Sequence, residues 1–153
     1  MSMGVNPLDW RTVLLAKHAQ HVVLIHFPIA LYIAGVASDF AARLTKRNEF
    51  AAVSYWNITG AALFTLPVIA TGLVAWQWQL EGQKLKGLLL YHLILAAVTG
   101  GVILATWLLQ FRARRNGARS VGFLGSSIEV VGVFLLVLTA HLGGFLSGVN
   151  GAP

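Results

Sequence analysis

Residues 87–111 read GLLLYHLILAAVTGGVILATWLLQF and contain no Asp, Glu, Lys or Arg. A helix needs about 20 mostly apolar residues to cross the hydrocarbon core of a bilayer, so this stretch alone indicates a membrane span. Three further stretches are also long and mostly apolar: residues 18–38, 50–80 and 120–153. Glu129 is the only charged residue among them. We therefore predict an all-α integral membrane protein with four spanning helices, at about residues 20–44, 52–79, 86–111 and 121–147.

The composition agrees with this fold class. Hydrophobic residues make up 57% of the 153 residues and charged residues 10%, whereas an ordinary soluble domain has about 25% charged residues. The predicted helices leave room only for short loops, and helices joined by short loops pack as antiparallel neighbours. We expect a single membrane domain, residues 1–153, folded as an up-down four-helix bundle. The first apolar segment lacks a small-residue cleavage pattern, so we expect it to remain as the first helix.

The composition also excludes several classes of site and partner. The chain has no cysteine, which excludes disulfides, thiolate metal sites, cysteine-ligated iron–sulfur clusters and covalent haem attachment. The net charge is +6, but the basic residues lie at predicted helix ends, where they act as topology signals. We therefore expect contact with the lipid bilayer rather than with nucleic acid.

The basic residues also predict the orientation, because Lys and Arg favour cytoplasmic loops. Of the 11 Lys and Arg residues, the larger group falls in the first and third loop regions. That group consists of Arg43, Lys46, Arg47, Arg112, Arg114, Arg115 and Arg119, against Arg11, Lys17, Lys84 and Lys86 on the other side. We expect both termini outside, and a multi-pass protein of the bacterial inner membrane.

All five histidines are expected near the outer face of the membrane. They are His18, His21, His26, His92 and His141. His26 and His92 lie about six residues into their helices and His141 about six residues before the end of its helix, which places each roughly 9 Å deep at about 1.5 Å per residue. Imidazole in apolar surroundings is costly unless it is paired or ligated, so this cluster indicates a bound cofactor or metal. His18, near the interface, is expected to be incidental.

Two imidazoles on facing helices can ligate the two axial positions of a b-type haem, and neutral imidazoles can also bind copper or zinc. A haem ring needs space along the helices as well as ligands. Small residues lie one and two turns beyond His26 and His92, whereas His21 and His141 stand over bulkier side chains. These small residues are Ala30, Ala34, Ala96 and Gly100. We predict His26 and His92 as the axial pair, with His21 and His141 as further cofactor contacts. Pro28 is expected to kink the first helix and so to aim His26.

Two carboxyl groups lie inside the apolar stretches, toward the inner half of the membrane. A charge at the bilayer centre costs at least about 2.5 kcal/mol, so Asp39 and Glu129 are candidates for function. Arg43 follows Asp39 by four residues, which predicts an ion pair on one helix face. For Glu129 two alternatives remain open: a proton or quinone site, or a hydrogen bond to Ser or Thr on a neighbouring helix.

Residues 21–31, HVVLIHFPIAL, carry a specific motif. The chain resembles a family of small bacterial four-helix membrane proteins that carries a domain-of-unknown-function label, whose members read His-Pro-x-x-x-His-Phe-Pro-Ile-Ala-Leu. The family's other positions match Asp39, His92, Gly143 and Gly144. Val22 replaces the proline after the first histidine, which leaves His21 less fixed. Such domains often accompany cytochrome c domains, so the resemblance implies electron transfer.

These observations lead to three functional hypotheses. The first is a b-type haem-binding subunit that transfers electrons between a periplasmic redox partner, such as a cytochrome c, and quinone or another membrane subunit. No nucleophile–base pair or catalytic acid pair is evident, so we expect a subunit of an oxidoreductase complex rather than an independent enzyme. The second is a non-redox scaffold or assembly subunit, because small residues and histidines also serve close helix packing. The third is a copper or zinc handling protein.

Overall fold

The computed structural model describes residues 17–79, 81–82, 84–118 and 120–148, and within these ranges the chain is helical, with turns and no strand. The helices are α2 (Lys17–Leu24), α3 (His26–Thr45), α4 (Asn48–Gln79), α5 (Gly87–Arg115) and α6 (Phe123–Leu146). Four segments are long and apolar enough to cross a membrane: Gln20–Thr45, Asn48–Trp78, Gly87–Arg115 and Phe123–Leu146. The predicted all-α class with four spans is confirmed.

The helix boundaries differ from the predicted ones by a few residues. The second span begins at Asn48 and the third ends at Arg115, each about one turn beyond the apolar stretch from which it was predicted. Charged and polar residues continue a helix readily once it leaves the hydrocarbon, so an apolar stretch marks the buried part of a span and not its full length.

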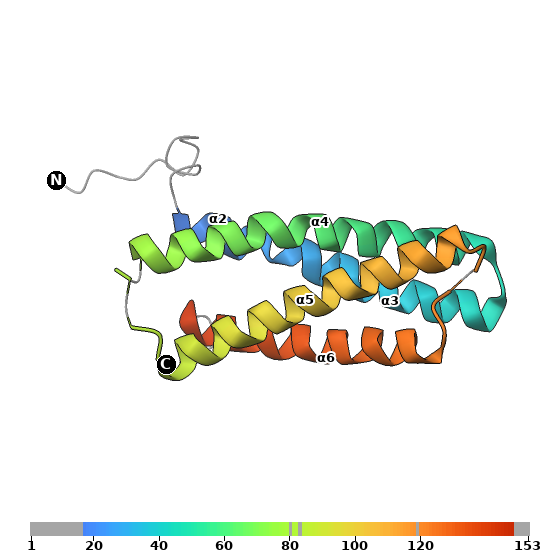
Figure 1. The fold of residues 1–153 in the computed structure, drawn as a ribbon. Helices are drawn as coiled ribbons and strands as arrows, with labels where there is room; N and C mark the ends of the chain where they lie inside the picture. The colour runs from blue at the N-terminus through green and yellow to red at the C-terminus, as the bar shows by residue number, and fades with distance from the viewer. Residues whose placement is uncertain (1–16, 80, 83, 119, 149–153) are drawn as a thin grey trace, which may run out of the picture.

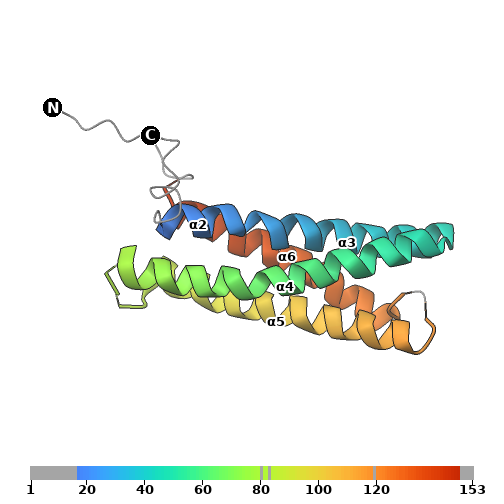
Figure 2. The same ribbon diagram turned by 90° about the horizontal axis from the view of Figure 1, so that it is seen from above.

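Successive long helices run antiparallel (Figure 1). α4 packs against α3 and α5, and α6 packs against α5 and α3, so that α3 and α5 lie diagonally opposite each other. The start of α2, the turn between α4 and α5, and the end of α6 lie at one end of the bundle (Figures 1 and 2). We call this the histidine end. The opposite end, formed by residues 45–48, 115–118 and 120–123, is called the arginine end.

Pro28 interrupts the first span, as expected. Proline has no N–H, so the carbonyl of Leu24 loses its helical donor. The helix is broken at Ile25, which keeps right-handed helical torsions (φ −60°, ψ −26°) between α2 and α3. The backbone hydrogen bonds Ile25 N to His21 O (3.0 Å) and Ile29 N to Ile25 O (3.4 Å) bridge the break. The span is therefore disturbed locally while the chain continues in one direction.

Large apolar side chains cover the outside of the bundle, and glycines allow close contact at particular points inside it. The most exposed hydrophobic side chains are Phe123 (89%), Leu44 (84%) and Leu124 (75%), which is the surface that lipid covers. At Gly35, where α3 meets α4, an added Cβ would lie 2.7 Å from Cδ1 of Ile58. Lipid tails are as apolar as leucine, so close backbone approach and interhelical hydrogen bonds hold membrane helices together.

Tyr32 joins three helices at the centre of the bundle. Its side chain is fully buried, and its hydroxyl shares a 2.9 Å hydrogen bond with Oγ1 of Thr106 on α5. The same hydroxyl lies 3.4 Å from the backbone carbonyl of Glu129 on α6. Gly132 faces the hydroxyl, and an added Cβ there would overlap it. The bundle thus accommodates the buried Tyr32 hydroxyl, because α5 and α6 supply hydrogen-bond partners and Gly132 leaves space for it.

This arrangement predicts coupling between Tyr32 and Gly132. The substitution Tyr32→Phe should lower the free energy of unfolding by about 1 kcal/mol, because it removes interhelical hydrogen bonds. Gly132→Ala should cost about 1–3 kcal/mol, because the new methyl group meets the Tyr32 hydroxyl. The double variant should lose less than the sum, since removing the hydroxyl makes room for the methyl group. Unfolding in mixed detergent micelles measures the loss of stability in all three variants. If the losses of the two single variants simply add up in the double variant, the contact between Tyr32 and Gly132 is contradicted.

The lack of native cysteine makes the predicted orientation directly testable. Gln77, near the histidine end, and Ala118, at the arginine end, are both exposed. Single cysteines placed there in intact cells should differ in reactivity toward a membrane-impermeant maleimide. Gln77→Cys should be labelled from outside, and Ala118→Cys only after permeabilisation, because the arginine-rich loops are expected in the cytoplasm. The reverse pattern would show that the orientation is inverted.

Candidate functional site

The helix ends bring four histidines to one end of the bundle. His21 lies in α2, His26 begins α3, His92 lies in the second turn of α5, and His141 lies in the last two turns of α6 (Figure 1). The side chain of His18 falls outside the described part of the chain. The four described imidazoles nevertheless have different surroundings, and these surroundings indicate what each one does.

His21 packs against α4. Its Nδ1 lies 3.2 Å from Oγ1 of Thr71, and a Cβ added to Gly72 would lie 3.0 Å from its Cε1. The ring therefore rests on the backbone of the neighbouring helix at a position where only glycine leaves room. This contact fixes α2 to α4 on the histidine end.

His92 makes the equivalent contact between α5 and α6. Its Nδ1 donates a 3.2 Å hydrogen bond to the carbonyl of Thr139, and a Cβ added to Gly143 would lie 3.1 Å from its Cε1. Two turns beyond His92 on α5, the hydroxyl of Thr99 shares a 2.9 Å hydrogen bond with the hydroxyl of the same Thr139. The predicted haem ligand thus also has a clear packing role.

His26 and His141 are exposed. Nδ1 of His26 donates a 2.7 Å hydrogen bond to the carbonyl of Val22 on the preceding turn. The His141 ring packs edge-on against Phe145, with the ring centroids 5.0 Å apart. Both imidazoles therefore lie on the outer surface of the bundle, at its histidine end.

The small residues beyond the two predicted axial ligands lie on different surfaces. Ala30 and Ala34 are exposed, like His26. Ala96 is half-buried, and Gly100 is buried against Thr65 and Ile69 of α4, where an added Cβ would lie 3.4 Å from Cγ2 of Thr65. The stripe beyond His26 therefore faces outward, whereas the stripe beyond His92 serves close packing against α4.

The carboxyl groups form a second site, toward the arginine end. Asp39 and Glu129 are buried, with 1% and 0% exposure. The predicted ion pair on α3 is present: Nε of Arg43 lies 2.7 Å from Oδ2 of Asp39. The same guanidinium donates to the carbonyl of Val121, two residues before α6 begins. Asp39 therefore fixes an arginine that joins α3 to the segment that leads into α6.

Glu129 receives its side-chain hydrogen bond from an amide rather than from Ser or Thr. Nε2 of Gln110 on α5 donates to Oε1 of Glu129 at 2.9 Å and to Oγ of Ser54 on α4 at 2.8 Å. Asp39 lines the same pocket as Gln110, which places it beside the residue that donates to Glu129. Side chains from all four spans thus meet at this point. Oε2 of Glu129 and Oε1 of Gln110 are buried and have no donor among the described residues.

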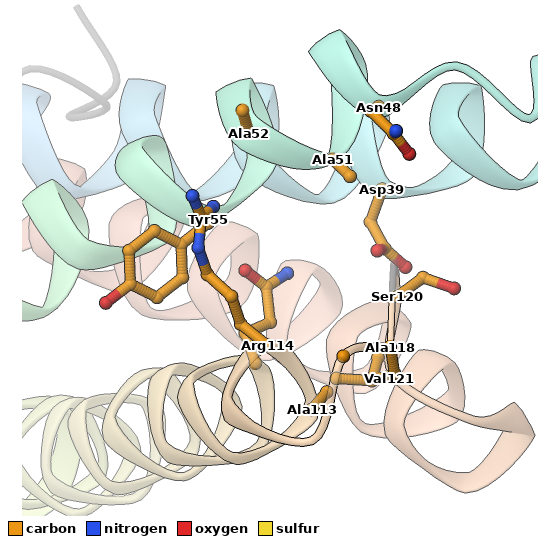
Figure 3. A pocket seen from close by; sticks show the side chains of 12 residues that line it. Asp39, Asn48, Ala51, Ala52, Tyr55, Ala113, Arg114, Ala118, Ser120 and Val121 are labelled. Carbon is orange, nitrogen blue, oxygen red and sulfur yellow. The ribbon is translucent and has the colours of Figure 1, made fainter.

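A pocket of about 340 Å³ adjoins this cluster at the arginine end. Its polar lining consists of Asp39, Asn48, Tyr55, Gln110, Arg114 and Ser120. Figure 3 shows Asp39 on one side of the pocket and Arg114 with Tyr55 on the other. The Arg114 guanidinium lies 4.7 Å from the centroid of the Tyr55 ring. The pocket reaches Asp39 and Gln110, and Gln110 in turn contacts Glu129.

Sequence reasoning missed Gln110, Ser54 and Tyr32, which complete the polar centre. None of them carries a charge, so none interrupts the charge-free stretches from which the spans were predicted. A count of amide and hydroxyl side chains within the spans would have found them, because polar groups inside a membrane need partners. In the described part of the chain, no group of three or more His, Cys, Asp or Glu residues is arranged to hold a metal ion.

The contact between His92 and Gly143 predicts a specific steric effect. Gly143→Val should destabilise the bundle by about 1–3 kcal/mol, because its side chain meets the imidazole. His92→Ala should relieve part of this loss in the double variant. Gly101→Val is the matched control on α5, since an added Cβ there meets nothing within 4 Å. Unfolding midpoints in detergent measure these effects. Equal losses at the two glycines would contradict the contact.

Comparison with known proteins agrees with the fold. No curated protein and no solved structure matches the chain significantly. Residues 17–152 match a family described as "Predicted membrane protein (DUF2231)". This match covers all the spanning helices, both carboxyl groups and every histidine. The chain therefore belongs to the DUF2231 family of membrane proteins.

Proposed function

We propose that this chain is a b-type haem-binding membrane subunit that carries electrons between a redox partner at its histidine end and quinone or another membrane subunit. The hydrogen bonding of two imidazoles supports the proposal. Nδ1 of His26 and Nδ1 of His92 each donate to a backbone carbonyl, at 2.7 and 3.2 Å. Iron binds the Nε2 lone pair of a neutral imidazole, and a carbonyl bonded to Nδ1 fixes the required tautomer. Within the described ranges, neither Nε2 atom has a hydrogen-bond partner.

The core restricts where a haem would lie. Tyr32, Ile103 and Leu136 belong to the cluster that fills the bundle centre. We therefore propose that the ring lies at the histidine end, outside this filled core, where His26 and His92 would hold it. Lys84 and Lys86 are exposed at this end and offer positive charge to the propionates. When bound, haem supplies a one-electron couple whose potential is set by the axial ligands and by burial.

The proposed setting is the bacterial inner membrane, with the histidine end facing the periplasm. A cytochrome c on that side is the proposed redox partner. The family match and the four apolar spans support the membrane setting. The chain would then act as an electron-transfer subunit of an oxidoreductase complex rather than as an independent enzyme.

A second candidate function is that of a non-redox membrane scaffold. The observation that favours it is the packing of His21 and His92, each of which rests on a glycine of the neighbouring helix. In this account the imidazoles fix the helix pairs at the histidine end and bind nothing. The copper or zinc alternative has less support, because the described residues offer no group of three ligands.

An optical spectrum of the protein purified in detergent distinguishes these candidates. We expect a reduced-minus-oxidised b-type spectrum with haem bound in stoichiometric amount. His26→Ala and His92→Ala should each lower the haem content at least tenfold, and added imidazole should restore part of it in His26→Ala. Gln77→Ala is the matched control, because it removes another exposed polar side chain from the same end.

Unfolding midpoints of the same variants separate ligation from packing. A colourless wild-type protein without iron, or haem retained in both His26→Ala and His92→Ala, would exclude the haem proposal. Loss of stability in His92→Ala without any bound haem in the wild type would favour the scaffold. Copper or zinc in a colourless protein would favour metal handling.

A further inference from the structure

The carboxyl cluster lies apart from the histidine end and has a different chemistry. Asp39 on α3 and Glu129 on α6 are both almost completely buried, and Gln110, which donates to Glu129, lines the same pocket as Asp39. Arg43 supplies one positive charge, which is paired with Asp39 at 2.7 Å. A second ionised carboxyl group would have no counterion of its own. An uncompensated charge in apolar surroundings is costly, so one of the two carboxyl groups should be neutral.

The hydrogen bonds identify which carboxyl group carries the proton. Asp39 accepts from Arg43, an interaction that needs an ionised acceptor to be strong. Glu129 accepts from Gln110 at Oε1 only, and its buried Oε2 has no donor among the described residues. Two carboxyl groups can hydrogen-bond to each other only if one is protonated. A proton on Oε2 of Glu129 would meet both requirements.

We propose that Asp39 and Glu129 form a proton-binding site, in which Glu129 holds a proton in a hydrogen bond to Asp39 and the pocket at the arginine end supplies it from water. The pocket reaches Asp39 and Gln110 directly. Gln110 is 6% exposed and its Oε1 has no described donor. This unpaired oxygen lies between the pocket and the carboxyl pair, and it can accept a hydrogen bond from an ordered water molecule.

The transfer needs no further reagent. A hydronium ion in the pocket gives its proton to the Asp39 carboxylate and leaves a water molecule. Asp39 then passes the proton to the Glu129 carboxylate and returns to its ion pair with Arg43. The site takes up one positive charge inside the membrane and releases it by the reverse path.

The groups around the pair limit what else can titrate there. From α3 these are Arg43 and Tyr32, and from α5 they are Gln110 beside Glu129 and Arg114 at the pocket. α4 contributes Ser54 and Tyr55. No other carboxyl group lines the described pocket. The proton therefore belongs to the Asp39–Glu129 pair.

Labelling with dicyclohexylcarbodiimide tests the proposal on the full chain. This apolar reagent adds to a protonated carboxyl group in a membrane and leaves a stable N-acylurea, which peptide mass spectrometry locates. We expect labelling at Glu129 at neutral pH, declining at alkaline pH and absent in Glu129→Gln. Glu49, whose side chain is 71% exposed at the arginine end, is the internal control and should stay unlabelled.

Asp39→Asn separates proton binding from a merely structural role. Without the Asp39 charge, Arg43 becomes the counterion of Glu129 and favours its ionised form. Labelling of Glu129 should then fall at least tenfold at neutral pH and recover on acidification. No labelling at Glu129 in the wild type at any pH would overturn the proposal, as would equal labelling in Asp39→Asn across all pH values.

A water-soluble carbodiimide tests the route. Ala51→Leu should narrow the pocket, which Ala51 lines, and should slow labelling of the pair by this reagent several-fold. Ala70→Leu, an exposed position farther along α4, is the matched control and should have no effect. Labelling by dicyclohexylcarbodiimide should be equal in both, because that reagent arrives through lipid. Equal rates with the water-soluble reagent would exclude the pocket as the path.

Discussion

Hydrocarbon offers no hydrogen-bond partner, so a polar side chain inside this bundle must find one on its own helix or on a neighbouring helix. Tyr32 shows the constraint most clearly, since its hydroxyl reaches Thr106 on α5 and the backbone of α6. Gly132 is glycine because that hydroxyl occupies the space where a side chain would begin. The position of α3 relative to α5 and α6 is therefore set by a hydrogen bond and a missing methyl group. Apolar contacts alone would not set it, because lipid competes for them equally well.

The same constraint organises the two ends differently. At the histidine end, His21 and His92 satisfy their Nδ1 atoms on neighbouring helices and rest on glycines. His26 satisfies its Nδ1 on its own helix and faces outward. An imidazole in that position suits ligation from outside the bundle better than ligation at its centre. At the arginine end, the Asp39–Glu129 cluster leaves two buried oxygens without a described donor, which marks the place where a proton or water completes the network.

Features that depend on one helix could be predicted from sequence. The charge-free stretches predicted the four spans, and Pro28 predicted a disturbance in the first span, which is the break at Ile25. The four-residue spacing of Asp39 and Arg43 predicted their ion pair. Features that depend on how each helix is rotated about its own axis could not be predicted from the sequence. α3 is apolar on nearly all sides, so periodicity does not show that His26, Ala30 and Ala34 face outward. Gln110 escaped notice because a neutral amide leaves no gap in hydropathy, and the pocket is formed by helix ends that meet only in the folded bundle.

The central claim is that Tyr32, Gln110 and the two buried carboxyl groups are paired across helices, and that the carboxyl pair achieves this by holding a proton. Infrared absorption of the protein in detergent at neutral pH tests it most directly. The account predicts a band from a protonated carboxyl group that shifts in deuterium oxide, disappears in Glu129→Gln and remains in Glu49→Gln. A wild-type spectrum without that band, or a band unchanged in Glu129→Gln, would contradict the account.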